Sequence, residues 1–333
     1  MQLDYWTRHW YSASVFHFST LLLLPFSWLF QLLVWVRSHL YRWGILRIYF
    51  FPVPVIVIGN VTVGGTGKTP LVMWVAHYLK AQGYSPGIVT RGIGSKKPWR
   101  QPHRVNAQDV AEDVGDEAIL LCKKSDSPVV VGIDRVAAIH FLLQQVHCDV
   151  IISDDGLQHY RMDRDIEIAV VDGARRFGNQ LLLPAGPLRE PVSRLKKVDF
   201  VMVNGGGGAQ DQNELRMMLQ PVACVAVRDP EKKMAMNYFV GKKVHAVAAI
   251  GHPQRFFQML VALGYDIIPH VFPDHYLYRR EDLNFKDDLP ILMTEKDAVK
   301  CEAFADEQYW YVSVGVIVSE NFQQDFTHKL ANV

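Results

Sequence analysis

The chain has 333 residues, enough for a large hydrophobic core and for two lobes, since single domains usually hold about 100 to 200 residues. Its 35 lysines and arginines nearly balance its 34 aspartates and glutamates, which excludes a global positive field, so no nucleic-acid partner is predicted. The four cysteines are scattered without a C-x-x-C pair, which argues against a zinc site and against a disulfide framework.

The first predicted element is an apolar segment, residues 15–36, which contains no Asp, Glu, Lys or Arg. An uncharged run of about 18 or more residues is a candidate membrane helix. Aromatic residues, which favour membrane interfaces, cluster around its ends. They are Trp6, Trp10, Tyr11, Trp35, Tyr41 and Trp43. Arginine is more frequent after the segment than before it, so a spanning helix would leave the rest of the chain in the cytoplasm.

Residues 1–45 are therefore interpreted as an N-terminal membrane-associated helix, and two arrangements stay open. The helix could span the bilayer, or it could lie in the interface, which Pro25 and the polar Ser27 and Gln31 favour equally well. A helix buried in the protein core is a further alternative. A cleaved signal peptide is not expected, because the apolar run is long and no small-residue cleavage motif follows it.

A glycine-rich loop, Thr62-Val63-Gly64-Gly65-Thr66-Gly67-Lys68-Thr69, follows an apolar strand predicted over residues 53–58. An amphipathic helix is predicted directly after the loop. In a phosphate-binding loop the backbone N–H groups cradle phosphates, the lysine reaches the terminal phosphates and the hydroxyl binds Mg²⁺. The strict pattern places glycine where this chain has Thr62. The strand, loop and helix context therefore supports the prediction of a nucleoside triphosphate site.

Predicted strands then alternate with predicted helices, which indicates a parallel sheet. The strands cover residues 87–90, 129–131, 150–153, 166–171 and 200–203, and the helices cover 113–123 and 134–145. A second series predicts a smaller C-terminal α/β lobe, with strands over 244–250, 267–272, 291–294 and 309–314 and a helix over 254–263. The chain is accordingly divided into residues 1–45, a P-loop nucleotide-binding core over 46–234 and the smaller lobe over 235–333. A mobile surface turn is expected at residues 205–208.

Two carboxylates, Asp154 and Asp155, directly follow the predicted buried strand over 150–153. Parallel sheets bind ligands at the carboxyl ends of their strands. Phosphoryl transfer requires an acidic residue there to hold the Mg²⁺ that bridges the terminal phosphates. One of the two is expected to bind the metal, and the pattern does not say which. A solvated Asp-Asp-Gly turn is the alternative.

Asp116 and Glu117 begin a predicted helix, where the helix dipole alone would favour them. His275 follows a strand of the smaller lobe and could reach across to Asp116, forming a pair that accepts a hydroxyl proton. Spacing cannot establish that proximity, and a lone histidine is more often structural. Arg91 and Arg189 are suited to binding phosphate, although surface charge also explains each of them.

Taken in chain order, seven short segments resemble the tetraacyldisaccharide 4'-kinase family of lipid A biosynthesis. They are V-T-V-G-G-T-G-K-T-P, T-R-G, V-G-D-E-A, S-D-D-G-L-Q-H, L-L-P-A-G-P-L-R-E, F-P-D-H-Y and T-E-K-D-A-V-K. The resemblance implies an α/β fold with a P-loop NTPase-type parallel sheet core. It also implies ATP- and Mg²⁺-dependent phosphorylation of the 4'-hydroxyl of a tetraacylated glucosamine disaccharide 1-phosphate at the cytoplasmic side of the inner membrane.

The resemblance further implies roles for single residues. Lys68 and Thr69 would hold the phosphates and Mg²⁺, and Asp154 with Asp155 would complete the metal region. Asp116 would accept the hydroxyl proton, with His275 tuning it. The positions implied to line the substrate are Arg91, Glu117, His159 and Arg189.

Two residues depart from the family's usual pattern. Ile93 stands where the family commonly has tyrosine, and Leu157 stands where it has phenylalanine. Isoleucine has no phenol, so any contact of that tyrosine with the disaccharide must be absent or must come from another residue.

The expected partners are an acylated disaccharide lipid and the membrane surface, and no protein partner is predicted. Each buried methylene of an acyl chain contributes about 0.8 kcal/mol, so such a lipid stays in the bilayer and the enzyme must approach it. The alternatives are a P-loop switch or metallochaperone ATPase, a soluble small-molecule kinase or ligase, and a structural membrane protein. The first two give the apolar N-terminal segment no role, and the third gives none to the phosphate loop.

Overall fold

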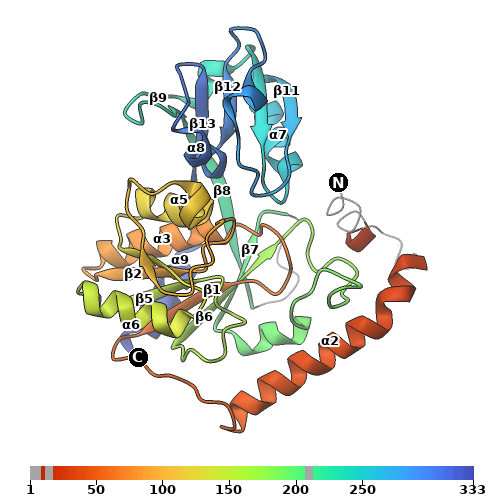
Figure 1. Cartoon of the computed structure of the whole chain (residues 1–333), viewed down its shortest axis with the longest axis vertical. Coiled ribbons are helices and arrows are strands. Elements are labelled where there is room, and N and C mark those ends of the chain that lie inside the picture. Colours follow the sequence, from red (N-terminus) through yellow and green to blue (C-terminus); the bar gives the residue numbers. More distant parts are fainter. Residues whose placement is uncertain (1–8, 12–17, 207–212) are drawn as a thin grey trace.

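The computed structural model describes residues 9–11, 18–206 and 213–333 of the chain (Figure 1). Parts of three sequence predictions lie outside these residues: the aromatic Trp6, the beginning of the apolar segment at 15–17, and residues 207 and 208 of the expected surface turn. The described residues form a larger and a smaller lobe joined by long strands, with a long helix beside the larger lobe.

The larger lobe is built on the predicted parallel sheet, with strand order β7-β6-β1-β5-β2-β4-β3. Only the short edge strand β3 pairs antiparallel within this described part of the sheet. The strands are β1 (Val55–Gly59), β2 (Pro86–Thr90), β3 (His103–Arg104), β4 (Val129–Val131), β5 (Val150–Asp154), β6 (Ile166–Asp172) and β7 (Phe200–Asn204). Their near-continuous apolar character follows from burial on both faces.

Strand β1 shows how the core is layered, because its side chains alternate between two hydrophobic clusters. Ile56 and Ile58 pack among the helices of one face, and Val55 and Val57 pack on the other face. The first face carries α3 (Lys68–Ala81), α5 (Asp116–Lys124) and α9 (Glu320–Ala331), and the second carries α6 (Arg135–Gln145). This packing brings the carboxyl ends of β1, β2 and β5 together at one edge of the sheet.

The helix predicted over residues 113–123 is interrupted, forming α4 (Ala111–Val114) and α5 with Gly115 between them. Gly115 has a φ of 93°, and a Cβ there would lie 2.4 Å from the carbonyl oxygen of Ile93. Both features require glycine. The break begins a new helix at Asp116, which is buried.

The smaller lobe continues the same sheet in the order β8-β13-β12-β10-β11, with β9 beside β8. Its strands are β8 (Glu214–Ala226), β9 (Lys233–Met234), β10 (Lys243–Ala248), β11 (Asp266–Val271), β12 (Ile291–Thr294) and β13 (Tyr309–Val318). Its helices are α7 (Pro253–Ala262) and α8 (Glu295–Cys301). Short 3₁₀ helices cover Val192–Lys197, Met236–Phe239 and Arg280–Leu283.

Strand β8 joins the lobes, and no strand was predicted at its position. It pairs in parallel with β7 at its beginning and antiparallel with β13 along its length. Pro221 lies within it, which normally argues against a strand, but here it faces a register shift between Ser313 and Val314. After β13 the chain returns to the larger lobe (Figure 1). There Phe322 of α9 contacts Trp74 of α3. The division of the chain at residue 234 stays a prediction.

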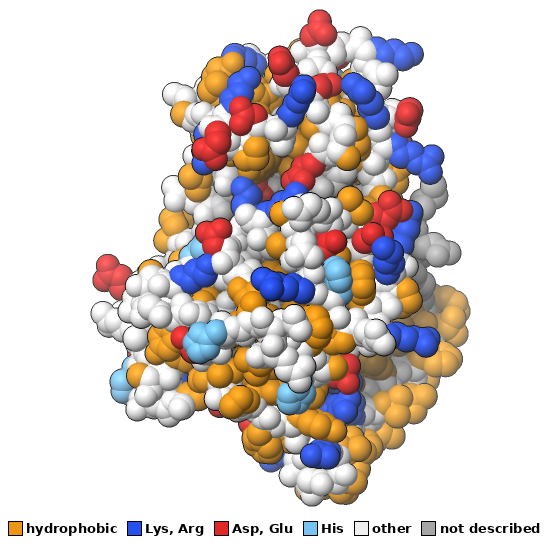
Figure 2. All heavy atoms as spheres, turned by 60° about the vertical axis from the view of Figure 1, so that its left-hand side comes forward, with side chains coloured by type: hydrophobic (Ala, Val, Ile, Leu, Met, Phe, Trp, Pro, Cys, Tyr) orange, Lys and Arg blue, Asp and Glu red, His pale blue; other side chains and the backbone are white. Residues whose placement is uncertain are grey.

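Helix α2 (Phe18–Arg42) is continuous through Pro25 and lies along the lower right of the larger lobe in Figure 1. From Thr20 to Arg42 it is long and apolar enough to cross a membrane, with a mean hydropathy of 1.5. Most of its apolar side chains are exposed, and hydrophobic side chains gather along the lower right edge in Figure 2. Those at least half exposed between Thr20 and Arg42 are Leu21, Leu22, Phe26, Trp28, Leu29, Leu32, Leu33 and Trp35. The alternative of a helix buried in the core is therefore not observed.

A narrow face of α2 attaches it to the larger lobe. The Ser27 hydroxyl donates a hydrogen bond to the carbonyl oxygen of Leu182 at 2.7 Å, and both groups are buried. Phe30 packs against Val61 and Leu188. The helix is thus fixed beside the loop that follows β1, while the apolar side chains of its outer surface are exposed.

Candidate active site

The predicted phosphate loop connects β1 to α3, as the strand, loop and helix pattern requires. Gly67 has a φ of 94°, and a Cβ at this position would lie 2.3 Å from Nδ2 of Asn204, so only glycine fits. Thr62, which stands where the strict phosphate-loop pattern has glycine, is buried and forms a β-bridge with Leu188 of the proline-rich segment. The backbone N–H of Val63 donates to the carbonyl oxygen of Pro187 at 2.8 Å. The proline-rich segment therefore holds the beginning of the loop.

A hydrogen-bonded chain fixes the end of the loop to the smaller lobe. Nδ2 of Asn204, a buried residue at the end of β7, donates to the carbonyl oxygen of Thr66 at 2.9 Å. The Asn204 side-chain oxygen in turn accepts a hydrogen bond from the guanidinium of Arg255, on α7, at 2.8 Å. Sequence reasoning missed both residues, because neither belongs to a glycine-rich or acidic motif.

Asp155 lies between two cations of the predicted site. Its carboxylate is 3.5 Å from Nζ of Lys68 and 3.0 Å from the guanidinium of Arg189. Burial acts to raise the pKa of Asp155, but the charges of Lys68 and Arg189 outweigh burial and hold the pKa far below its usual range. Asp155 is therefore ionised at neutral pH, and it keeps Lys68 and Arg189 together at the mouth of the phosphate loop.

Asp154, the last residue of β5, is fully enclosed and is held differently. Its Oδ2 accepts a hydrogen bond from the Thr90 hydroxyl at 3.1 Å, whereas its Oδ1 is buried with no hydrogen-bond partner among the described residues. Burial, together with the negative charges of Glu117 and Asp155, raises the pKa of Asp154 to about 7. A divalent cation would give this unpartnered oxygen a ligand bond, and its charge would favour the ionised form of the Asp154 carboxyl group.

The residues present fit a magnesium site of the P-loop type. Thr69 follows Lys68 in the first turn of α3. No group of three or more His, Cys, Asp or Glu side chains with metal-ligand geometry occurs in residues 9–11, 18–206 and 213–333. Such a cluster is not required, because Mg²⁺ at nucleotide sites takes one or two protein oxygens and completes its shell with phosphates and water.

Asp116 and His275 come together across the two lobes, as hypothesised. Nδ1 of His275 lies 2.9 and 3.0 Å from the two carboxylate oxygens of Asp116. Burial acts to raise the pKa of Asp116, but the hydrogen bond from His275 and the charges of nearby lysines lower it below its usual value. Burial acts to lower the pKa of His275, and the bond to Asp116 raises it overall.

The pair lies close to the phosphate loop. Gly251, between β10 and α7, lies against the phosphate loop and against Asp274, the neighbour of His275. A Cβ on Gly251 would be 2.9 Å from the backbone nitrogen of Gly65 and 3.4 Å from Oδ2 of Asp274. A second close approach involves Gly94, where a Cβ would lie 3.0 Å from Nδ1 of His275. The loops after β1, β2 and β11 thus converge on one place.

The predicted substrate residues divide into two groups. Arg91, His159 and Arg189 line a cavity of about 550 Å³, and Ile93 lines it too. The opposite wall of this cavity comes from α2, through Phe30, Leu33, Val34 and Arg37. Glu117 instead lies beside Asp116, where its carboxylate is 3.2 Å from Nζ of Lys296.

His159 is neutral in this cavity. Its Nε2 accepts a hydrogen bond from the backbone N–H of Arg135 at 3.3 Å. Burial, followed by the charge of Arg135, lowers the pKa of His159 to about 4. The positive charge available to an anion in the cavity therefore comes from the arginines.

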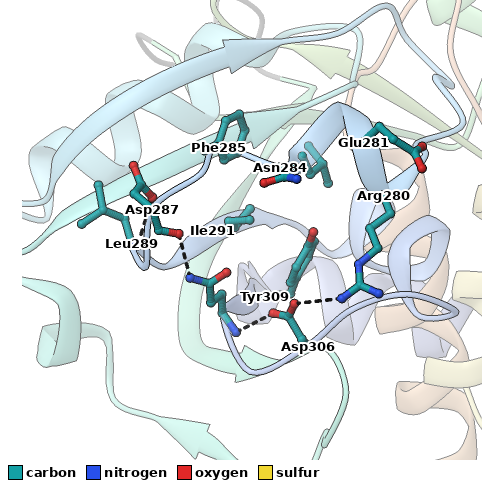
Figure 3. Close-up of a pocket in the computed structure, with 11 residues that line it drawn as sticks. Arg280, Glu281, Asn284, Phe285, Asp287, Leu289, Ile291, Asp306 and Tyr309 are labelled. Atoms are coloured by element: carbon teal, nitrogen blue, oxygen red, sulfur yellow. Dashed lines mark hydrogen bonds and ion pairs between the residues drawn. The ribbon is translucent and has the colours of Figure 1, made fainter.

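Another cavity, of about 240 Å³, lies in the smaller lobe among Arg280, Asp287, Asp306 and Tyr309 (Figure 3). None of the predicted site residues lines it. The Arg280 guanidinium is 3.8 Å from the Asp306 carboxylate across it. The geometry thus gives no reason to place the chemistry here.

The sequence model of the family described as tetraacyldisaccharide-1-P 4'-kinase matches residues 19–331. The chain belongs to this family. A tetraacyldisaccharide 4'-kinase of Nitrosococcus oceani is 50% identical over 95% of this chain and 91% of the relative. That of Methylobacillus flagellatus is 45% identical over 98% of this chain and 96% of the relative. A crystal structure of LpxK from Aquifex aeolicus in complex with ATP has a TM-score of 0.79 at 27% identity, covering 93% of this chain and 99% of that one.

Membership of the tetraacyldisaccharide-1-P 4'-kinase family makes the chain an enzyme and confirms the recognition of the family and the α/β fold. It decides against the switch ATPase, the small-molecule kinase and the structural membrane protein. The two departures from the family pattern differ in their consequences. Leu157 is buried, and a Cβ on Gly59 would lie 2.7 Å from its Cγ, so it belongs to the core. Ile93 makes one wall of the cavity apolar.

Several residues of the kinase site were missed from the sequence. Lys296 and Lys300 of α8 approach Asp116 at 3.8 and 3.9 Å. Their spacing of four residues places them on one face of a helix, which was the available signal. Gln158 donates to the carbonyl oxygen of Asn60 at 3.0 Å and to the buried Glu190 at 3.2 Å, and both lie in the quoted motifs.

Proposed function

We propose that this kinase transfers the γ-phosphate of ATP to the 4'-hydroxyl of a tetraacyldisaccharide 1-phosphate, a lipid A precursor, at the cytoplasmic face of the inner membrane. The observation that carries the proposal is the Asp116–His275 pair, which the two lobes assemble beside the phosphate loop. The family relationship supports the same reaction.

ATP is proposed to bind with its phosphates on the Thr62–Thr69 loop. The amino-terminal end of α3 and the backbone N–H groups of the loop favour anions there. Lys68 and Arg189, which now share the charge of Asp155, are close enough to one another to bind one phosphate group together. Each would donate charge-assisted hydrogen bonds to the phosphate, and such bonds are about twice as strong as neutral ones.

Asp154 and Thr69 are proposed to hold Mg²⁺. Asp154 has an orphaned buried oxygen, whereas the oxygens of Asp155 already accept hydrogen bonds from Arg189, so Asp154 is the direct ligand in this proposal and Asp155 stays in the outer shell. When bound, the metal neutralises charge on the terminal phosphates.

Asp116 is proposed to be the general base. Its lowered pKa keeps it ionised at neutral pH, and its position between the lobes lets it accept the proton of a hydroxyl that approaches the γ-phosphate. His275 orients it by bonding to both carboxylate oxygens. Glu117, the next residue, is proposed to position the sugar ring.

The disaccharide is proposed to occupy the cavity between α2 and the larger lobe. Arg37, Arg91 and Arg189 give it a positive lining suited to the phosphate of the substrate, and the neutral His159 offers a ring for hydrogen bonding or contact with a sugar. The wall made by α2 continues directly into the exposed apolar surface of that helix. A lipid whose head group lay in the cavity would thus keep its acyl chains along the exposed apolar surface of α2.

The exposed side of α2 is proposed to lie in the cytoplasmic interface of the inner membrane. Burial of apolar side chains contributes about 25 cal/mol per Å² removed from water, which favours insertion of this side into the bilayer. The attachment through Ser27 and Phe30 would then fix the cavity at the level of the lipid head groups.

The experiment is to incubate the purified chain with ATP, Mg²⁺ and a tetraacyldisaccharide 1-phosphate in mixed micelles and to identify the product by ³¹P and ¹H NMR. A phosphomonoester at the 4' position, lost in Lys68→Ala, is expected. Consumption of ATP without a phosphorylated lipid, or phosphate at another hydroxyl, would contradict the proposal.

A further inference from the structure

Lys296, on α8 of the smaller lobe, reaches into the Asp116–His275 pair. Its Nζ lies 3.8 Å from Oδ2 of Asp116, 3.2 Å from Oε1 of Glu117 and 3.5 Å from Oδ1 of Asp274. Its side chain is 17% exposed. Burial acts to lower the pKa of Lys296, but the three carboxylates raise it above its usual value. The residue is a permanent cation at the centre of the site.

The same ammonium lies 3.5 Å from Nε2 of His275. An ammonium group has three donors and no acceptor, so it can form a hydrogen bond with this nitrogen only when the nitrogen carries no proton. The other ring nitrogen, Nδ1, faces both oxygens of Asp116, and a nitrogen that bonds to a carboxylate carries the proton. When the ring is neutral, the two contacts therefore specify the same tautomer, protonated at Nδ1 and bare at Nε2.

We propose that Lys296 is a positioning residue of the phosphoryl transfer, which fixes the neutral ring of His275 as the Nδ1–H tautomer and so leaves Asp116 as an oriented, ionised base. This inference rests on the proposed function, in which Asp116 takes the proton of the lipid hydroxyl. In that step the hydroxyl oxygen bonds to the γ-phosphorus, the bond from phosphorus to the ADP oxygen breaks, and Asp116 becomes a neutral carboxylic acid. A proton already present on the Asp116 carboxylate would prevent the step.

Other charged groups face the pair, and they do not replace Lys296. Glu117 from α5 and Asp274 beside His275 are acidic, so they favour protons on the pair. Lys300 lies 3.9 Å from Asp116, but its charge is balanced by an ion pair with Asp297 at 2.7 Å, and both side chains are buried.

The neighbouring helix α4 adds little charge at the pair. Its acidic residues, Glu112 and Asp113, form exposed ion pairs with Lys96 and Lys97. Lys296 therefore supplies the positive charge that contacts both Asp116 and His275.

The tautomer can be measured without any activity. We would record ¹⁵N spectra of the native kinase labelled at histidine, with the His275 signals assigned by their loss in His275→Gln. The expected result is a protonated Nδ1 and a bare Nε2 in the neutral ring. The opposite tautomer in the native protein would overturn the inference, whether or not any variant folds.

The second test is the pH dependence of kcat for lipid phosphorylation. In Lys296→Met, loss of a cation within 4 Å should raise the pKa of both Asp116 and His275, so the acid limb should move to higher pH by about one unit or more. Lys296→Arg keeps the charge and should restore most of the native profile. A native profile in a folded Lys296→Met would overturn the inference.

Lys123→Met is the matched control, because it removes another ion pair between the lobes, Lys123 with Glu302, which does not touch Asp116. Its acid limb should stay in place, and an equal shift in this control would assign the effect to loss of lobe contact and overturn the inference. If the native chain did not phosphorylate the lipid at all, the proposed function would fail, while the ¹⁵N spectra would still decide the tautomer.

Discussion

The guanidinium of Arg255, in the smaller lobe, donates a hydrogen bond to the side-chain oxygen of Asn204 at 2.8 Å, and Asn204 holds the carbonyl oxygen of Thr66 in the phosphate loop. The conformation of the loop is thereby tied to the position of the smaller lobe. A charged hydrogen bond of this kind contributes about 1.5–3 kcal/mol.

Arg255→Ala should therefore raise the KM for ATP by about tenfold, which corresponds to roughly 1.4 kcal/mol, and leave the KM for the lipid nearly unchanged. Initial rates at varied ATP would measure this. Arg280→Ala, which removes an exposed arginine of the same lobe, is the control and should leave both constants unchanged. Equal ATP constants for Arg255→Ala and the native chain would show that the hydrogen bond does not support the loop.

Glycine is required at position 67 for two reasons that substitutions can separate. At both Gly64 and Gly67 φ is positive, but a Cβ meets Asn204 at 67 and nothing within 4 Å at 64. A left-handed conformation costs a non-glycine residue about 1–2 kcal/mol. Gly64→Ala should lose about that much unfolding free energy and Gly67→Ala clearly more, as measured by denaturant unfolding without nucleotide. Similar losses at the two positions would mean that the close approach to Asn204 is unimportant.

The exposed face of α2 can be tested by removing its apolar side chains. Leu22, Phe26 and Leu29 share one face of the helix and are each more than half exposed. Replacing all three with serine should strongly reduce co-sedimentation of the kinase with phospholipid vesicles and reduce turnover of long-chain lipid, while the affinity for ATP stays native.

The control for this variant is serine at three exposed valines of the smaller lobe, Val240, Val261 and Val271. It should bind vesicles as the native chain does. Undiminished vesicle binding by the α2 variant would contradict the role of the helix at the membrane.

The stability of the kinase should depend on pH through His275. Because its pKa is raised in the folded state, its stabilising contribution is complete below the unfolded pKa of about 6.5 and is lost as pH rises through the folded value. Asp116 has a lowered pKa, so its contribution is lost only in acid. His275→Gln should therefore cost more unfolding free energy at about pH 6 than at about pH 9. The opposite order would mean that Asp116 does not stabilise the protonated ring.

Much of this structure could be predicted from the sequence because its signals are local. The alternation of strands and helices, the glycine-rich loop and the two carboxylates at the end of β5 all lie within short segments. Strand β8 was missed because Pro221 and polar residues disrupt its pattern, and the bulge opposite Pro221 that permits pairing arises on a distant strand.

The site was predicted less completely, because it joins residues that are far apart in the chain. Asp116 and His275 are 159 positions apart, so spacing suggested their contact only as a hypothesis, strengthened by the family resemblance. Lys296 lies in the T-E-K-D-A-V-K segment that carries the family resemblance, but no role was predicted for it. Its contact with the pair depends on how α8 packs against α5, which no local pattern encodes.

The most direct test of the account separates the chemical step from nucleotide binding in Asp116→Asn. Single-turnover transfer of labelled γ-phosphate to the tetraacyl disaccharide 1-phosphate in mixed micelles would be measured beside the Kd for ATP. We expect transfer to fall by at least about 100-fold, as for loss of a general base, with the Kd for ATP close to native. Transfer at a near-native rate would contradict the assignment of Asp116 as the base, and with it the mechanism proposed for this kinase.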